Sequence, residues 1–186
     1  MISRDEALTL LKEHIEEPNL INHCLESEAV MRGLAAKLGR DRELWGITGL
    51  LHDLDYSTME NESRHGLDTA DMLTGKLPDE ALAAIRRHAF EMNGAEAPKA
   101  EFDFALRCGE TVTGLVHAGA LVRPTKIDGM KVKSLKKKMK DKAFAASVNR
   151  DCIRECDKIG LELGDFLQIA IGSITAIAPE VGLAAE

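Results

Sequence analysis

The stretch GLLHDLDY, Gly49–Tyr56, places a histidine and an aspartate side by side at the end of an apolar run. His52 and Asp53 can have two roles there: they can end a helix, or they can hold a metal ion. Neutral imidazoles and carboxylates together suit borderline transition metals. The remaining sequence has to decide between these two interpretations.

Helix start and stop signals recur along the whole chain. Ser3 with Glu6 forms a capping-box signature, Gly39 is a typical helix stop, and Pro78 precedes an acidic first turn. These signals predict helices over about residues 3–16, 20–38, 42–53, 64–74, 79–92, 101–121, 149–159 and 163–177. No segment alternates apolar and polar residues over the length of a strand. We therefore predict an all-α fold and a single domain over residues 1–186.

The composition is that of a globular protein, with 45% hydrophobic residues in 186. There is no apolar run of about 18 residues that would cross a membrane, and no signal peptide begins the chain. We expect a cytoplasmic protein with no membrane partner. The four cysteines form no CxxC pair, so free buried thiols are expected even though Cys152 and Cys156 lie one helical turn apart.

The net charge of −7 is unevenly distributed. Residues 123–150 carry ten Lys or Arg against two Asp, a local balance of +8 that leaves −15 for the rest. This basic segment, at about 124–145, predicts a local contact with an anion. It lacks interleaved aromatic residues, so no nucleic-acid partner is expected.

Several histidines fall on apolar helix faces or near helix ends. His23 begins an inward-facing stripe and His88 ends another, while His65 can turn inward or toward solvent. A single such histidine is usually a satisfied core residue. Several of them beside Asp53 favour a metal site. His14 is expected to be solvated, and His117 shares a face with Glu110, which makes it a weaker candidate ligand.

These residues arrive in the order of a known family. His23, the pair in GLLHD, the His65-Gly66 dipeptide and the segment AIRRH ending at His88 resemble the HD-domain superfamily of metal-dependent hydrolases, in particular HDIG-type members that bind two metals. The segments CGETVTGLVHAGALVRP (108–124) and KSLKKKMKDKAFAASVNR (133–150) resemble small bacterial members. The resemblance covers about residues 22–177 and implies the HD-domain helical bundle.

The resemblance also implies a set of metal ligands. Asp53 would bridge two ions and act in catalysis. His23, His52 and Glu110 would complete one ion, and His65 and His88 would bind the other. A pair of ions can share a hydroxide and lower its pKa for in-line attack on a phosphate ester. One or two divalent ions of Fe, Mn, Zn or Ni fit this donor set. A single ion, with His65 and His88 facing the substrate, is the alternative.

Two departures from the family pattern bear on function. Gly109-Glu110 stands where the family usually has Ala-Asp, so the carboxylate is one methylene longer, and Asp103 is an alternative two turns earlier. Many phosphohydrolases of the superfamily have a lysine soon after the HD pair, where this chain has Asp55 and Tyr56. That lysine would neutralise phosphate, so its absence bears on the substrate class.

Residues for substrate contact are suggested by position alone. Asp68, one turn after His65, can orient that imidazole or shuttle a proton, or it can lie on a solvated helix face. Arg64 and Arg87, like Arg86, neighbour proposed ligands and can clamp phosphate oxygens or face water. Lys133 and Lys137 represent the lysine cluster, which can fold across a metal cleft or stay solvated.

The sequence thus predicts a metal-dependent phosphohydrolase that acts on a small phosphorylated molecule, with a nucleotide as the first choice, by metal-activated hydroxide. Two alternatives stay open. One is a di-iron oxygenase of the HD type, and the other is a non-catalytic HD domain used in binding or regulation. The protein is expected to be a monomer or a homodimer.

Overall fold

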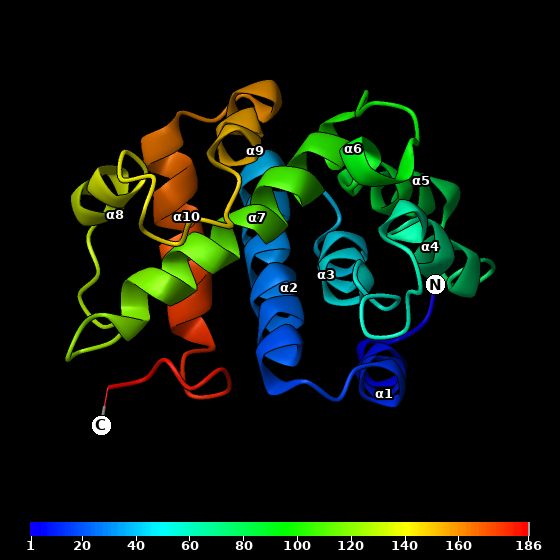
Figure 1. Ribbon diagram of the computed structural model, residues 1–186, viewed down its shortest axis with the longest axis horizontal. Helices are drawn as coiled ribbons and strands as arrows, with labels where there is room; N and C mark the ends of the chain where they lie inside the picture. The colour runs from blue at the N-terminus through cyan, green and yellow to red at the C-terminus, as the bar shows by residue number, and fades with distance from the viewer. Residues whose placement is uncertain (186) are drawn as a thin grey trace.

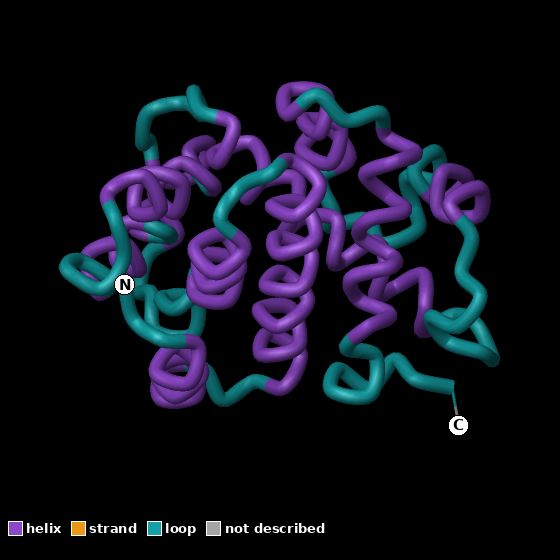
Figure 2. Tube along the Cα trace, turned by 180° about the vertical axis from the view of Figure 1, so that it is seen from behind, coloured by secondary structure: helices purple, strands orange, loops and turns teal. Residues whose placement is uncertain are grey.

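The computed structural model describes residues 1–185 and is built from helices joined by loops, with no β-strand in that range (Figure 2). The all-α prediction is confirmed. The α-helices are α1 Arg4–His14, α2 Pro18–Leu38, α3 Arg42–Leu51, α4 Leu67–Met72, α5 Asp79–His88, α6 Phe90–Asn93, α7 Glu101–Leu121, α8 Val132–Lys138, α9 Arg150–Arg154 and α10 Leu163–Ala176. The 3₁₀ helices are η1 Glu62–Arg64 and η2 Glu155–Ile159.

The predicted end signals operate as their chemistry requires. Ser3 and Glu6 form a reciprocal capping box at the start of α1. Asp41 accepts hydrogen bonds from the first backbone N–H groups of α3, and Gly39 ends α2 with a φ of 67°. The helix bounds therefore follow from short local signals over the first third of the chain.

Three predicted helices are interrupted in the structure. The helix expected over 79–92 breaks at Ala89, where Arg107 Nη1 donates a hydrogen bond to the His88 carbonyl oxygen at 2.6 Å. The one expected over 64–74 begins only at Leu67, because Gly66 adopts a φ of 76°. The one expected over 149–159 divides into α9 and η2. The first two interruptions lie beside the histidines of the site.

The two longest helices, α2 and α7, form the centre of the fold (Figure 1). They cross near the middle of the molecule and contact each other along the crossing. Helices α1, α3, α4 and α5 lie on one side of this crossing, and α8 and α10 lie on the other (Figure 1). Helices α3 and α10 pack against both α2 and α7, whereas α1 and α4 pack on α3 and α5 further out.

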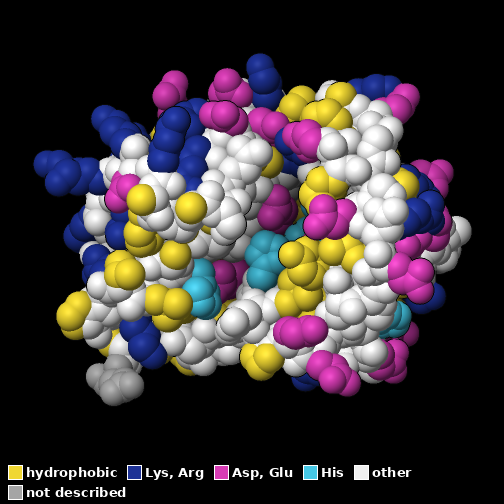
Figure 3. Space-filling model, viewed as in Figure 1, with side chains coloured by type: hydrophobic (Ala, Val, Ile, Leu, Met, Phe, Trp, Pro, Cys, Tyr) yellow, Lys and Arg dark blue, Asp and Glu magenta, His cyan; other side chains and the backbone are white. Residues whose placement is uncertain are grey.

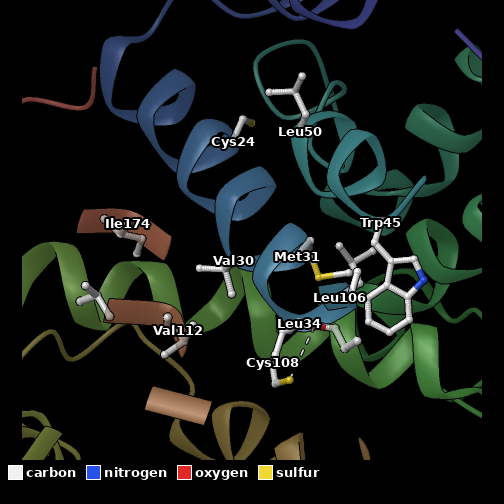
Figure 4. Close-up of a cluster of buried hydrophobic side chains, with 14 of the residues drawn as sticks. Cys24, Val30, Met31, Leu34, Trp45, Leu50, Leu106, Cys108, Val112 and Ile174 are labelled. Carbon is white, nitrogen blue, oxygen red and sulfur yellow. Dashed lines mark hydrogen bonds between the residues drawn. The ribbon is translucent and has the colours of Figure 1, made fainter. Parts of the chain in front are cut away.

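Aliphatic side chains fill the space between these helices (Figure 4). Met31 and Leu34 of α2 lie against Leu106 of α7 in the buried core. Trp45 of α3 stacks on Phe102 of α7, with ring centroids 4.8 Å apart and planes 4° from parallel. The core is therefore made almost entirely of aliphatic contacts with one aromatic stack, as the sparse aromatic content requires.

Two glycines let α2 approach its neighbours. A Cβ on Gly49 of α3 would lie 2.8 Å from both the Ser27 carbonyl oxygen and Met31 Cγ of α2. A Cβ on Gly109 of α7 would lie 2.9 Å from Met31 Sδ. Close contact of α3 and α7 with the same part of α2 brings His52 and Glu110 near His23.

Two sequence expectations concern membranes and thiols. No single helix between residues 1 and 185 is long and apolar enough to cross a membrane, although α9–η2 and α10, bent by 105°, pass that test as a pair by length and composition. The expected cytoplasmic location stays a prediction. All four cysteines are free and buried, as predicted.

A Gly49→Ala substitution is expected to destabilise the protein by about 1–3 kcal/mol, because the new methyl group would overpack the α2–α3 contact against backbone. Gly172→Ala is the matched control. It adds a methyl group where nothing lies within 4 Å, and it should stabilise α10 by roughly 0.5–1 kcal/mol. Free energies of unfolding from chemical denaturation measure both effects, and equal stability of the two variants would contradict this account of the crossing.

Candidate metal centre

Six polar side chains from five parts of the fold converge on one buried point. His23 lies on α2, and His52 and Asp53 directly follow α3. His65 follows η1, His88 is the last residue of α5, and Glu110 lies in the middle of α7. The structure thus brings together the ligand set that the sequence suggested.

Asp53 lies between two groups of imidazoles. On one side, His52 Nε2 is 3.2 Å from Asp53 Oδ1, and His23 Nε2 is 3.5 Å from Oδ2. On the other side, the Nε2 atoms of His65 and His88 are 3.5 and 3.4 Å from Oδ1. Each group of three can hold one metal ion, and Asp53 is common to both.

Backbone carbonyls determine how two of the rings face the centre. The Nδ1 atom of His52 is 2.8 Å from the Gly49 carbonyl oxygen, and that of His88 is 2.6 Å from the Ile85 carbonyl oxygen. A carbonyl only accepts, so each Nδ1 carries a proton and donates it. In the neutral ring the Nε2 atom then has a free lone pair, and it faces Asp53.

His65 and His23 are oriented in the same sense by side chains. His65 Nδ1 donates to Asp55 Oδ1 at 2.8 Å. His23 Nδ1 lies 2.8 Å from Thr113 Oγ1, whose own hydroxyl donates to the Glu110 carbonyl, so Thr113 accepts from the ring. All four histidines therefore present an Nε2 lone pair to the same small volume, with Nδ1 anchored outside it.

This donor set fits a divalent transition metal. The Nε2 atoms of His23 and His52 face each other at 3.2 Å, and those of His65 and His88 at 3.1 Å. Lone pairs that face one another repel unless a cation or a proton lies between them. Asp53 Oδ1 is buried and receives no hydrogen bond, so it too lacks a positive partner. Imidazole nitrogen with carboxylate oxygen suits iron, manganese, zinc or nickel.

The protonation states agree with this arrangement. Burial, together with the neighbouring His23 and His88, lowers the pKa of His52 to about 3, so its ring is neutral at neutral pH. Burial is the largest effect on Asp53 and would raise its pKa, but positive charge on the neighbouring imidazoles and the close approach of the His88 ring hold that pKa well below its usual value. Burial would lower the pKa of His88, but Asp53 raises it, so His88 is the ring that takes up a proton where no cation lies between it and Asp53. Burial raises the pKa of Glu110 to about 7, against the opposing effect of His23. Protons and metal ions would therefore compete for this site.

Glu110 is near the centre but not within its closest set. Its Oε2 lies 3.8 Å from His23 Nε2, and its carboxylate also accepts a hydrogen bond from the Thr111 hydroxyl. The alternative ligand, Asp103, lies elsewhere, since its carboxylate caps α7 and pairs with Arg87 at 3.1 Å. Glu110 is thus the carboxylate that α7 provides to the centre.

The prediction for Asp68 requires correction. Asp68 forms an exposed ion pair with Arg64 and does not reach His65. The carboxylate that orients His65 belongs to Asp55, which also accepts from the backbone N–H groups of Gly66 and Thr69 at 2.7 and 3.1 Å. The signal in the sequence was available: Asp55 follows the HD pair by two residues, where the family lysine was sought.

The basic residues proposed for substrate contact also lie outside the site. Arg64 pairs with Asp68, and Arg87 pairs with Glu96 at 2.9 Å and with Asp103. Lys133 and Lys137 are exposed on α8, and neither lines the cavity above the metal centre. The loop that follows the lysine cluster does reach that cavity, through residues 147–149. Sequence position alone could not separate the lysines from this loop.

The cavity above the centre has a volume of about 680 Å³. The side chains of His23, Asp53 and Glu110 are among those that line it. Figure 3 shows histidine and acidic side chains inside a hollow near the middle of this face, with hydrophobic side chains along one wall. A small molecule can therefore reach the lone pairs of the centre.

The fold is all-helical over the described residues, and its buried Asp53, shared by two groups of histidines, could hold metal ions. The sequence matches the HD domain family over residues 20–141, a range that includes all six site residues. This chain belongs to the HD domain family. Searches of curated proteins and of solved structures found no match. Family membership indicates metal-dependent, hydrolase-type activity.

His117, the weaker candidate, lies apart from the centre. Its Nδ1 is 2.6 Å from Oε1 of the buried Glu26, and this hydrogen bond, against partial burial, raises the pKa of His117. A raised folded-state pKa stabilises the protein fully below the unfolded value, about 6.5, and this contribution is lost as pH rises through the folded value.

The contribution of the His117–Glu26 hydrogen bond to stability should depend on pH, which free energies of unfolding measured across pH can detect. The stability advantage of wild type over His117→Gln is expected to be larger at about pH 5.5 than at about pH 9, because the charged imidazole is the form that Glu26 stabilises. A constant difference across that range would contradict the assignment.

Metal content separates Asp55 from Asp68. Removing an outer carboxylate that orients a ligand histidine lowers metal affinity by about 10–100-fold. Asp55→Asn is therefore expected to weaken one ion, with a second ion left in place, whereas Asp68→Asn should bind metal like wild type. His88→Ala should retain close to half the wild-type metal. Elemental mass spectrometry after dialysis against limiting metal gives these ratios, and equal loss in both Asp variants would refute the role of Asp55.

Proposed function

We propose that this protein is a phosphohydrolase that acts on a small phosphorylated molecule, with a nucleotide as the first class to examine. The observation that carries the proposal is the convergence of four outward-anchored histidines on Asp53, whose buried Oδ1 accepts no hydrogen bond, at the floor of a cavity of about 680 Å³. The ligands at the base of the cavity could hold metal ions that activate a water molecule, and the cavity is open enough for a phosphate monoester to reach them.

The residues that would hold the ions are those described above. His23, His52 and Asp53 form one group, with Glu110 3.8 Å from His23, and Asp53, His65 and His88 form the other. Bound divalent ions would supply an activated water and neutralise the negative charge that develops on the phosphoryl oxygens. Asp53 is common to both groups, so it would fix their relative position.

The chain itself provides orientation and exclusion of water. Thr113, the Gly49 carbonyl, Asp55 and the Ile85 carbonyl hold the four rings so that their lone pairs need not reorganise. In the reaction the water oxygen bonds to phosphorus, the ester P–O bond breaks, and the leaving oxygen takes up a proton. The products are an alcohol and inorganic phosphate.

The Asp53→Asn substitution is expected to reduce phosphatase activity by at least about 100-fold, because it removes the ligand common to both groups. Asp68→Asn, which changes a partly exposed carboxylate on α4 that pairs with Arg64, should retain wild-type activity. Release of inorganic phosphate from a panel of phosphomonoesters measures this, with reconstitution by Mn, Fe, Zn or Ni after chelation.

The same preparations separate the rival functions. An iron-loaded protein that consumes dioxygen in step with substrate, and releases no phosphate, would replace the proposal with an HD-type oxygenase. Protein that binds no metal under any reconstitution would replace it with a non-catalytic binding domain. Undiminished hydrolysis by Asp53→Asn would refute the assignment of the site.

A further inference from the structure

The charges that line the cavity are few and mostly negative. Among the described residues that line it, the carboxylates are Asp53, Glu91 and Glu110, the one cationic side chain is Arg107, and no lysine is present. Two divalent ions would turn this small negative excess into a small positive one. That positive charge is about enough to balance one phosphate dianion. The cavity has no further cation for a second or third phosphate.

Arg107 cannot supply that missing charge. Its guanidinium has five N–H donors, and five hydrogen bonds occupy them. Nη1 donates to the His88 carbonyl and Glu91 at 2.6 and 3.0 Å, Nη2 to Glu91 and Glu155 at 2.7 and 2.9 Å, and Nε to Glu155 at 2.7 Å. The Arg107 side chain itself is buried. Arg107 therefore holds the end of α5 in place and has no donor free for phosphate.

Two of the side chains that line the cavity are large, apolar and partly exposed. Tyr56 and Met92 both line the cavity, and they are 49% and 46% exposed. They are two of only five large hydrophobic side chains that are exposed in residues 1–185. The Tyr56 ring meets the His65 ring edge to face, with centroids 5.5 Å apart. An apolar ring thus lies directly beside one of the candidate metal ligands.

A third apolar group is held rigidly on the same cavity. Val148 lies against α7, where a Cβ on Gly114 would approach Val148 Cγ2 at 3.0 Å. Arg150 donates to the carbonyls of Val148, Phe144 and Ala145, so it fixes the loop that carries Val148. The part of the cavity that Val148 lines is therefore in place before any substrate binds, which lowers the entropic cost of binding.

We infer that the substrate of this site is a phosphate monoester whose leaving group carries a flat apolar ring, and that Tyr56 and Met92 determine this specificity. The inference rests on the proposed function and deepens it. Selectivity comes from apolar contact with the leaving group, because no free cation is available to clamp phosphate oxygens. Diphosphates and triphosphates are excluded by Glu91, whose side chain is half exposed at the cavity, and by the saturated Arg107.

In the reaction the ring leaves as its alcohol. Water oxygen bonds to phosphorus, the P–O bond to the ring-bearing group breaks, the leaving oxygen gains a proton, and inorganic phosphate is released. No oxidant or second substrate is needed. A nucleoside monophosphate meets this description through its base, and an aryl phosphate meets it directly.

The test compares phenyl phosphate with glycerol phosphate on metal-loaded protein. Wild type should prefer phenyl phosphate in kcat/KM. Met92→Ala should reduce kcat/KM for phenyl phosphate about tenfold and leave glycerol phosphate within about twofold, because it removes one apolar contact. Tyr56→Ala should reduce the ratio of the two kcat/KM values about tenfold, and this ratio cancels any effect that the lost His65 contact has on the metal centre. Leu121→Ala, an exposed apolar residue outside the cavity, is the matched control and should change neither substrate.

A second readout does not depend on turnover. Phenylphosphonate cannot be hydrolysed, and calorimetry should show that it binds about tenfold more tightly than methylphosphonate. Met92→Ala should lose that preference with its metal content unchanged. Because Tyr56 and Met92 are about half exposed, both variants are expected to fold, and their melting temperatures check this.

Glu91 allows the charge of the cavity to be tested separately. Glu91→Gln removes a negative charge from the cavity and one ion-pair partner from Arg107, so hydrolysis of a nucleoside diphosphate should rise relative to the monophosphate. Equal rates on phenyl and glycerol phosphate, or a wild-type preference for triphosphates, would overturn the inference and leave the phosphohydrolase proposal standing. Fully metal-loaded protein that hydrolyses no phosphomonoester would overturn both.

Discussion

The structure depends on how the buried carboxylate of Asp53 is neutralised. Its Oδ1 has no hydrogen-bond donor, and three Nε2 atoms lie within 3.5 Å of it. A buried charge is costly unless it is paired, so this carboxylate requires positive charge at the centre. The histidines that face Asp53 come from separate segments. The C-terminal ends of α3 and α5 and the turn before α4 therefore have to meet at Asp53. The crossing of α2 with α3 and α7 at Gly49 and Gly109 meets this requirement.

Helix ends are the device that orients the rings. His52 caps α3 and His88 is the last residue of α5, and each bonds through Nδ1 to the carbonyl three residues earlier. The last carbonyls of a helix have no intrahelical partner, so they are free to accept from these rings. Ending a helix and holding a metal are therefore not alternatives for His52, since the first produces the carbonyl that orients it for the second.

Sequence reasoning found the histidines and Asp53 because short-range signals mark them: apolar stripes, helix stops and the HD dipeptide. It offered Asp68 as a residue that could orient His65 because the two lie one helical turn apart, with a solvated helix face as the alternative. Gly66, with its positive φ, breaks that helix, and the turn after Asp53 brings Asp55 to His65 instead. Arg107 was missed entirely, because its five hydrogen bonds go to three residues in three separate segments and no local pattern predicts their meeting.

Helix α7 joins the core to the site. Arg107, Glu110, Thr111 and Gly114 follow helical spacing along one face, and all four line the cavity, while Leu106 and Val112 point into the core. Glu110 carries its carboxylate further from the backbone than the aspartate usual in the family. Thr111 holds that carboxylate on one side, and Thr113 ties the Glu110 carbonyl to His23 on the other. Two threonines of α7 thus hold the carboxylate and the backbone carbonyl of Glu110, and its Oε2 lies 3.8 Å from His23 Nε2. The replacement of aspartate by glutamate is therefore compatible with an intact centre, and α7 determines both how that centre is held and how little free positive charge surrounds it.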